Sequence, residues 1–304
     1  MSQNDDKRQT QERDLLTLPQ IRERIDSVDM RMRDLFVERM QLSDQVAQVK
    51  ARTEDQIYKP DREAQIIARQ SALVDESVAM EYRAFLKRIM EVSRKYQYGR
   101  TLQLRKCFPY TFSDTVPEIG RAVMVRDELY ICDFCEKDQV KTVRSYADVQ
   151  VQLQAGEADT GIGIIERIGS GVSDELNSML LRCHLYINQC RVLQMGEEKY
   201  KVVAFSKRLA VTPEHNRLKI VFITANRSGA LGSILSMIAD YGVNLTEIHS
   251  IPFKPGQDWN YRLFAELTLN LQDEKAQALI FQLSQETASM QLLGSYRCEG
   301  DFVS

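Results

Sequence analysis

The feature that most constrains this chain is a regular apolar pattern close to its N-terminus, over residues 17–52. Apolar side chains recur at alternating steps of three and four residues, with one step of seven, at Ile21, Ile25, Val28, Met32, Leu35, Leu42, Val46 and Val49. This spacing predicts one face of a long α-helix that begins at Thr17 or Leu18, just before Pro19. At roughly 1.5 Å per residue the helix is about 50 Å long. It cannot bury that face alone, so it needs other helices of this chain or a partner chain.

Arg39 occupies the place in this pattern where an apolar residue is expected, between Leu35 and Leu42. A buried guanidinium without a partner costs several kcal/mol. Two interpretations stay open: a structural ion pair with a neighbouring helix, or an anion site inside a helical bundle. Lys50 lies three turns further along nearly the same face, about 16 Å away along the axis. The two cations could converge on a small dianion, although Lys50 alone also fits a solvated lysine in the last turn.

Arg22 lies on the same predicted helix, about 25 Å from Arg39 along the axis. That distance is too long for both arginines to bind one small ligand within a single chain. In an antiparallel dimer, however, Arg22 could reach the site of the other chain. The alternative is that Arg22 is an ordinary surface arginine.

A second helix is predicted to begin near Pro60. Proline suits a first helical position, and Asp61 and Glu63 suit the positive end of the helix dipole. Arg62 does not, because a cation in the first turn costs roughly 0.3–1 kcal/mol. Its presence therefore raises the possibility of a role other than helix formation.

A third helix is predicted from about Asp75 to Tyr98. Its expected apolar face is formed by Val78, Tyr82, Phe85, Leu86, Ile89 and Val92. Ser93 and Gln97 are one helical turn apart and share a face, so they could act together. Polar residues are also common close to a helix end, which leaves a purely structural reading open for both.

After residue 100 the sequence no longer shows the spacing of long helices. Residues 101–212 alternate strand-like and helix-like segments and predict an α/β domain, with Ser173 as the N-cap of one helix. Residues 213–304 have the order strand, helix, strand, strand, helix, strand, which predicts a ferredoxin-like α+β sandwich with Gly242 just after its first helix. The expected architecture is therefore multidomain: an all-α domain at 17–100, then these two.

Composition narrows the class of protein. The 304 residues carry a net charge of −3, which argues against nucleic acid as the main partner. No apolar run approaches the roughly 20 residues of a membrane span. Residues 1–16 are polar, lack a signal-peptide core and predict a disordered lead-in. Six cysteines in a chain of this length without that signal suggest a reducing cytoplasm.

No motif in the chain predicts a metal or a cofactor. Cys132 and Cys135 have zinc-ligand spacing, but a second such pair is lacking. Cys183, His184 and Cys190 could complete a site in three dimensions, yet ordinary thiols are the favoured interpretation. The glycines of GIGIIERIGSG fit neither phosphate-binding pattern. The role of the Cys132 and Cys135 pair stays open.

The first hundred residues resemble the all-helical chorismate mutase family, an intertwined dimer of three-helix chains. The matching stretches are IRERIDSVD, VERMQLSDQVAQVK and IYKPDREA. The resemblance implies that seven residues form the catalytic site: Arg22, Arg39, Lys50, Arg62, Glu63, Ser93 and Gln97. It implies that Arg39 and Arg22 of the partner chain bind the two carboxylates of chorismate, with Arg62 and Ser93 completing that shell. Lys50 and Gln97 would face the ether oxygen, and Glu63 would accept from the ring hydroxyl.

The other two segments resemble parts of prephenate dehydratases. SGALGSIL and VNLTEIHSIP are similar to an ACT regulatory domain, which implies a homodimer or larger oligomer that binds an aromatic amino-acid effector. The implied effector-binding residues are Gly229, Ala230, Leu231, His249, Ser250 and Pro252. SYADVQVQLQAGEADTGIGIIERIGSG resembles one dehydratase lobe, with Glu166 kept but Arg167 in place of an asparagine. Because most of a second lobe is missing, we expect no dehydratase activity.

The sequence thus predicts a cytoplasmic chorismate mutase that makes prephenate for phenylalanine and tyrosine synthesis, without metal or cofactor. One alternative is a true bifunctional enzyme that goes on to phenylpyruvate. The other is a non-catalytic regulator that senses aromatic metabolites and modulates another enzyme of the pathway.

Overall fold

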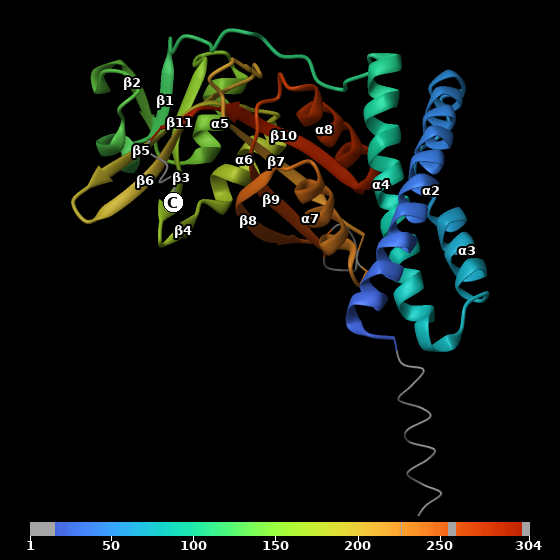
Figure 1. The fold of residues 1–304 in the computed structure, drawn as a ribbon. Helices are drawn as coiled ribbons and strands as arrows, with labels where there is room; N and C mark the ends of the chain where they lie inside the picture. The colour runs from blue at the N-terminus through green and yellow to red at the C-terminus, as the bar shows by residue number, and fades with distance from the viewer. Residues whose placement is uncertain (1–15, 226, 255–259, 300–304) are drawn as a thin grey trace, which may run out of the picture.

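The chain folds into a helical arm, formed by three helices, and an α/β body built on one large sheet (Figure 1). The computed structural model describes residues 16–225, 227–254 and 260–299; apart from Leu16, the predicted lead-in 1–16 lies outside them. The helices are α2 (Leu18–Thr53), α3 (Pro60–Ser71), α4 (Ala79–Arg105), α5 (Tyr146–Gln154), α6 (Asp174–Cys183), α7 (Ala230–Asp240) and α8 (Glu274–Glu286), with short 3₁₀ turns at Glu76–Val78, Arg126–Ile131 and Lys137–Gln139. The strands are β1 (Ala122–Val125), β2 (Val140–Val143), β3 (Thr160–Ile168), β4 (Gly171–Val172), β5 (Tyr186–Met195), β6 (Glu198–Ser206), β7 (Arg217–Ile223), β8 (Asn244–Phe253), β9 (Asn260–Thr268), β10 (Ser289–Tyr296) and β11 (Cys298–Glu299).

The predicted long helix is confirmed as α2. Thr17 caps its start in a reciprocal arrangement with Gln20, and proline lies in the first turn. The helix ends where Glu54 adopts a left-handed conformation, with φ of 57°. α3 begins at Pro60, also as predicted.

α4 differs from the sequence prediction in its length and in its buried face. It continues to Arg105, beyond the expected end at Tyr98. The predicted apolar face is partly open to solvent, since Val78 and Phe85 are exposed. The fully buried positions are instead Met90, Ser93, Arg94, Tyr98, Thr101 and Leu102. The reason is that the C-terminal half of α4 packs on α8, where Tyr98 and Leu102 contact Phe281.

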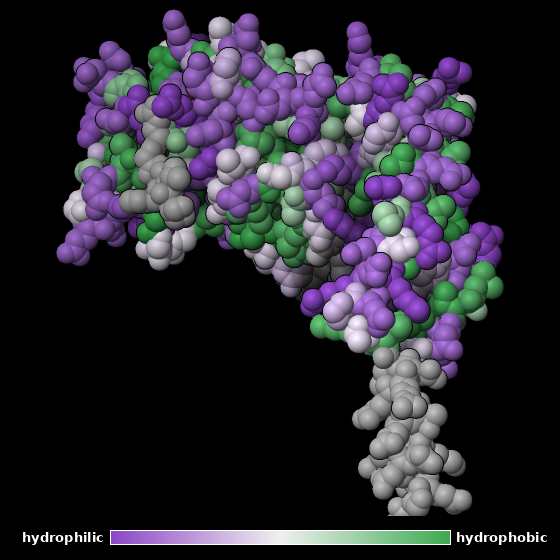
Figure 2. All heavy atoms as spheres, in the orientation of Figure 1, coloured by the Kyte–Doolittle hydropathy of each residue, from purple (hydrophilic) through white to green (hydrophobic). Residues whose placement is uncertain are grey.

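The apolar face of α2 stays exposed in the single chain. Its residues Ile21, Ile25, Val28, Met32, Leu35, Leu42, Val46 and Val49 are all exposed, and Leu35 is the most open of them at 64%. Only Ser43 and Ala47 of this helix are fully buried, where α2 packs against α4. Figure 2 shows apolar residues among the polar ones over the helical arm.

The α/β body is built on a single sheet of eleven strands. Nine of them follow the order β2-β1-β3-β6-β5-β10-β7-β9-β8. The short strand β4 pairs with β3, and the short strand β11 pairs with β5. The strands of both predicted domains, 101–212 and 213–304, therefore belong to one sheet. Within the second segment the order strand, helix, strand, strand, helix, strand is observed as predicted. Gly242, with φ of 73°, follows the end of α7 as expected.

Gly294 on β10 makes the junction between the two halves of the sheet. It pairs with Ile187 on β5. Its φ is 151°, and a Cβ there would lie 2.3 Å from the Ile187 carbonyl oxygen. Only glycine lets the two backbones approach this closely.

The helices cover opposite faces of the sheet. α7 and α8 pack on the face that carries Ile220 of β7, whereas α5 and α6 pack on the face that carries Val221. Because α8 faces the sheet on one side and α4 on the other, it fixes the helical arm to the body (Figure 1). Within the described ranges, none of the helices is long and apolar enough to cross a membrane.

Candidate active site

Arg39 of α2 reaches across to α4. Its Nη1 donates to the Ser93 hydroxyl and to the Ile89 carbonyl oxygen, the latter at 3.3 Å. Both acceptors are neutral, and no carboxylate of the described residues lies within ion-pair distance of the guanidinium. Burial lowers the pKa of Arg39, and the more distant Glu63 opposes this. The structural ion pair that the sequence left open is thus not formed within the described chain, and the cation remains available to an anion.

Lys50, three turns further along α2, is held at the loop before α3. Its Nζ donates to the Ile57 carbonyl oxygen at 2.8 Å. Burial lowers the pKa of Lys50; nearby Asp55 and Glu63 raise it, while Lys59 and Arg62 lower it. The hydrogen bond to Ile57 holds the loop before α3 close to the end of α2.

Gln97 contributes a half-buried amide on α4. Its Oε1 is shielded from solvent and has no hydrogen-bond partner among the described residues. Ser93, one turn earlier, is buried and already bonded to Arg39. A buried polar atom without a partner is rare in proteins and often marks a place where a ligand completes the bonding.

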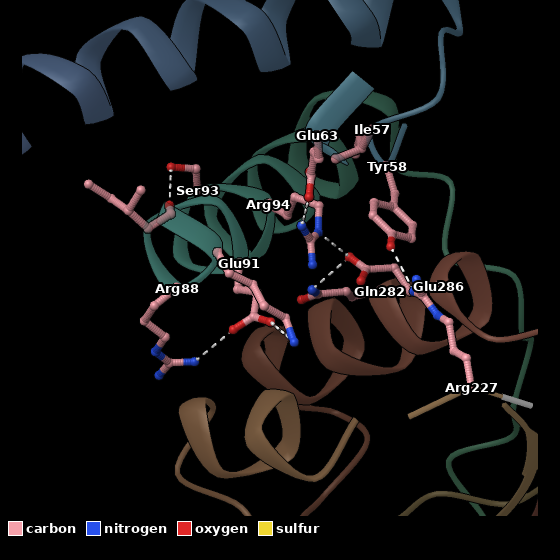
Figure 3. A network of polar contacts seen from close by, with 12 residues as sticks. Ile57, Tyr58, Glu63, Arg88, Glu91, Ser93, Arg94, Arg227, Gln282 and Glu286 are labelled. Atoms are coloured by element: carbon pink, nitrogen blue, oxygen red, sulfur yellow. Dashed lines mark hydrogen bonds and ion pairs between the residues drawn. The ribbon is translucent and has the colours of Figure 1, made fainter. Parts of the chain in front are cut away.

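Glu63 of α3 forms an ion pair with Arg94 of α4, at 2.5 Å. Arg94 also contacts Glu286 of α8 at 3.0 Å and lies over the Tyr58 ring at 4.5 Å (Figure 3). Sequence reasoning missed Arg94. A signal was present, because Arg94 lies one turn from both Met90 and Tyr98 and so interrupts an apolar face with a cation.

Arg62 and Arg22 complete the predicted set but differ from the others. Both are exposed. Arg62 lies in the first turn of α3 next to Glu63, whereas Arg22 lies near the other end of α2 from Lys50. Arg39, Lys50, Glu63, Ser93 and Gln97 thus come from three packed helices, and Arg22 is remote from them in one chain.

The predicted effector residues fall into two groups. Gly229 caps α7 with φ of 79°, and Ala230 and Leu231 form its first turn. Gly229 and Ala230 line a cavity of about 270 Å³ between the helical arm and the body, together with Tyr58, Glu63 and Arg94.

The second group lies on the edge strand β8. His249 stacks on Phe264, with ring centroids 5.0 Å apart, and its Nδ1 is 2.9 Å from the Glu247 carboxylate. Ser250 and Pro252 are exposed on the other side of the strand. His249 is not among the residues that line the cavity beside Gly229, so one chain does not bring the two groups together there.

The cysteines that could have bound zinc make ordinary contacts. Cys132 donates weakly to the Cys135 carbonyl oxygen at 3.8 Å, and burial raises the pKa of Cys135 to about 11. Cys190 lies instead beside Cys298, with the two sulfurs 3.4 Å apart. In residues 16–225, 227–254 and 260–299, no group of three or more histidines, cysteines or acids is arranged to hold a metal.

Comparison with known proteins adds family information to this geometry. The family model described as chorismate mutase type II matches residues 21–98. This range holds α3 and nearly all of α2, together with the part of α4 that bears Ser93 and Gln97. The N-terminal helices are a chorismate mutase type II domain.

A curated relative is similar to only part of the chain. A bifunctional chorismate mutase/prephenate dehydratase of Aquifex aeolicus (strain VF5) is 27% identical over 113 residues, which is 37% of this chain. The match spans only 31% of that relative's length. Beyond the mutase domain itself, this similarity alone assigns no activity to the chain.

Solved structures resemble the chain in fold. The structure of GqqA, described as a novel type of quorum quenching acylase, has a TM-score of 0.50 at 18% identity and covers 58% of this chain and 93% of its own. A prephenate dehydratase from Streptococcus mutans has a TM-score of 0.47 at 16% identity, over 58% of this chain and 97% of its own. At such identities the likeness to GqqA concerns the fold alone.

Proposed function

We propose that this protein is a chorismate mutase that converts chorismate to prephenate. The observation that carries the proposal is the partly buried guanidinium of Arg39, which has only neutral partners in the described chain. It lies in a chorismate mutase type II domain. A dianionic substrate supplies the counter-charge that the fold itself does not.

The reaction suits such a site. Chorismate rearranges within one molecule: the ether C–O bond breaks while a new C–C bond forms, and no group is transferred to the protein. Catalysis requires that the compact reactive conformer be held in place and that negative charge developing on the ether oxygen be stabilised. Planar arginine forks bind carboxylates, often through two hydrogen bonds.

The resemblance to the family assigns the roles. Arg39, with Arg22 of a second copy, binds the two carboxylates, and Arg62 and Ser93 complete that shell. Lys50 donates to the ether oxygen. Its present acceptor, the Ile57 carbonyl, occupies one of the three protons of the ammonium group and leaves two for substrate.

Gln97 and Glu63 meet the remaining polar groups of the substrate. The Gln97 amide donates to the ether oxygen beside Lys50. Glu63 accepts from the ring hydroxyl through Oε1, because Arg94 bonds to Oε2. The site thus presents cations to the carboxylates and one acceptor to the hydroxyl.

We propose a homodimer as the active form. The exposed apolar face of α2 supports this, because eight exposed apolar residues on one face of a helix need an apolar partner surface. A second copy would also bring Arg22 to the site, which a single chain cannot do.

The remaining chain is proposed to regulate rather than to catalyse. Residues 101–212 are a dehydratase-like lobe without dehydratase activity, and residues 213–304 are an ACT domain. The β7-α7-β8-β9-α8-β10 order supports the ACT assignment. The rival candidates are a bifunctional enzyme and a non-catalytic regulator.

One assay separates these candidates. Purified protein is given chorismate, and chorismate loss, prephenate and phenylpyruvate are measured after a work-up without acid, since acid converts prephenate chemically. Prephenate alone supports the proposal. Phenylpyruvate formation supports the bifunctional enzyme, and no chorismate turnover supports the regulator.

A further inference from the structure

A chain of hydrogen bonds runs from the α/β body into the mutase domain (Figure 3). The Arg94 guanidinium donates from Nε to Oε1 of Glu286 and from Nη1 to Oε2 of Glu63. Glu286 is the last residue of α8, whereas Glu63 lies in the first turn of α3. One arginine therefore connects a predicted catalytic carboxylate to Glu286, which follows Arg94 by 192 residues.

Glu286 is itself held in a defined position. Gln282, one turn earlier on α8, donates from Nε2 to Oε1 of Glu286 at 3.0 Å. The Tyr241 hydroxyl, just after α7, donates to Oε1 of Gln282 at 3.1 Å. The Glu286 side chain is only 6% exposed, and that of Arg94 is 10% exposed. A buried network in which each member is bonded gives a single geometry.

The opposite charges in this network counteract the effect of burial on the pKa of Arg94 and of Glu286. Burial alone lowers the pKa of Arg94, but Glu286 and Glu63 outweigh this and raise it above its ordinary value. Arg94 therefore stays charged. For Glu286, burial raises the pKa, and the Arg94 guanidinium opposes that effect.

A second ion pair joins the same two parts of the molecule and lines the same cavity, but it makes no hydrogen bond or ion pair with Glu63 or Arg94. Arg88 of α4 contacts Asp240 of α7 through both guanidinium nitrogens. Its only other ion-pair partner in the described chain is Glu91, on its own helix. The arm can thus be attached to the body by Arg88 and by the apolar contacts of Tyr98 and Phe281. Attachment alone does not explain why Arg94 also binds Glu63.

We propose that Glu286 is a positioning residue for the mutase reaction: it fixes Arg94, and Arg94 fixes Glu63 with one carboxylate oxygen free for the substrate hydroxyl. No described residue donates to that oxygen, Oε1 of Glu63. The C-terminal domain is then part of the mutase site rather than only a neighbour of it. This inference rests on the proposed function, and specifically on the role of Glu63.

A double-mutant cycle tests this. Glu286→Ala is made in the wild-type chain and in a Glu63→Gln chain, and kcat and KM for chorismate are measured for all four proteins. If Glu286 acts through Glu63, Glu286→Ala lowers kcat/KM about tenfold in the wild-type background and less than about twofold in the Glu63→Gln background. Glu286→Gln, which keeps the volume and one acceptor oxygen, shows the same pattern with a smaller loss and serves if the alanine variant does not fold.

Asp240→Ala is the matched control, because it removes the other ion pair between α4 and the body. It should change kcat/KM less than about twofold in both backgrounds. Equal losses from Glu286→Ala in the two backgrounds, or no loss in either, overturn the inference while the proposed function stands. A wild-type chain that does not turn over chorismate overturns the proposed function, and this inference with it.

Discussion

Arg39 on α2 donates a hydrogen bond to the hydroxyl of Ser93 on α4, 54 residues further along the chain. The contact joins two residues that the sequence had singled out for separate reasons. The Arg39 cation has no negatively charged partner in the described chain, since it donates to a hydroxyl and a carbonyl oxygen. A partly buried arginine bonded only to neutral acceptors is prepared for an anion that comes from outside the chain.

The first prediction concerns the apolar face of α2. Leu35, which is 64% exposed in the single chain, should lie in a dimer interface. Leu35→Glu places two carboxylates in that interface and should weaken dimerisation at least about 100-fold. Val37→Glu changes a similarly exposed apolar residue on the opposite side of α2 and should leave the dimer intact. Analytical ultracentrifugation over a concentration series measures both; a dimer unaffected by Leu35→Glu would contradict the proposed interface.

The second prediction concerns acid stability. Burial raises the pKa of Glu247, but the His249 ring, 2.9 Å away, and the Lys219 cation outweigh it and bring the pKa to about 2, against an ordinary 4.5. Because the folded pKa is depressed, this carboxylate stabilises the fold above pH 4.5, and the contribution is lost as the pH falls from 4.5 towards 2. The difference between the folded pKa and the ordinary pKa corresponds to about 3 kcal/mol of unfolding free energy.

Glu247→Gln should therefore lower the unfolding free energy by about 3 kcal/mol at pH 7, since it also removes the carboxylate that forms an ion pair with the buried Lys219 ammonium. The difference from wild type should narrow as the pH falls below 4.5. Glu157→Gln, which removes an exposed pair with Lys141, should have little effect at any pH. Urea unfolding at several pH values measures this, and a pH-independent difference for Glu247→Gln would refute the assignment.

The third prediction concerns the junction of the sheet. A side chain at Gly294 would meet the Ile187 backbone and would also be strained by a φ of 151°. Gly294→Ala should cost about 3 kcal/mol or more of unfolding free energy. Gly232→Ala, at a helical position of α7 with open space around it, should be neutral or slightly stabilising. A neutral Gly294→Ala would mean that β10 and β5 do not pair this closely.

Local patterns predicted much of this fold, and long-range contacts account for the differences. The start and length of α2, the proline start of α3 and the cap at Ser173 depend on residues close together in the sequence, and the structure confirms them. The buried face of α4 depends on α8, which follows some 170 residues later, so periodicity favoured the wrong face. Gly294 similarly carries no local sign that it joins two predicted domains.

In the candidate site, too, local patterns predicted some residues and long-range contacts determined the others. Arg39 stood out because it broke an apolar pattern, and Arg62 because it opposed a helix dipole. Arg94 broke a pattern too, but on a side of α4 other than the predicted apolar face. Its connection to Glu286 could not be read from spacing, because the two residues meet only once the body has folded against α4.

The fourth prediction concerns the effector. The resemblance of VNLTEIHSIP to ACT regulatory domains implies an arginine at the position of Ile251, and His249 is already in contact with Phe264 and Glu247. Phenylalanine should therefore bind weakly or not at all. Isothermal titration calorimetry with phenylalanine should show no saturable heat in the micromolar range. Tight, saturable binding would contradict the prediction and would assign a sensing role to other residues of β8.

The most direct test of the central claim is the turnover of chorismate by Arg39→Ala, compared with wild type and with Arg33→Ala. Arg33 is an exposed arginine of the same helix, paired with its neighbour Asp34, and serves as the matched control. We expect wild type and Arg33→Ala to make prephenate at similar rates. Arg39→Ala should lose at least about 100-fold in kcat/KM while its circular dichroism spectrum stays that of wild type. Near-wild-type turnover by Arg39→Ala would contradict the proposed site.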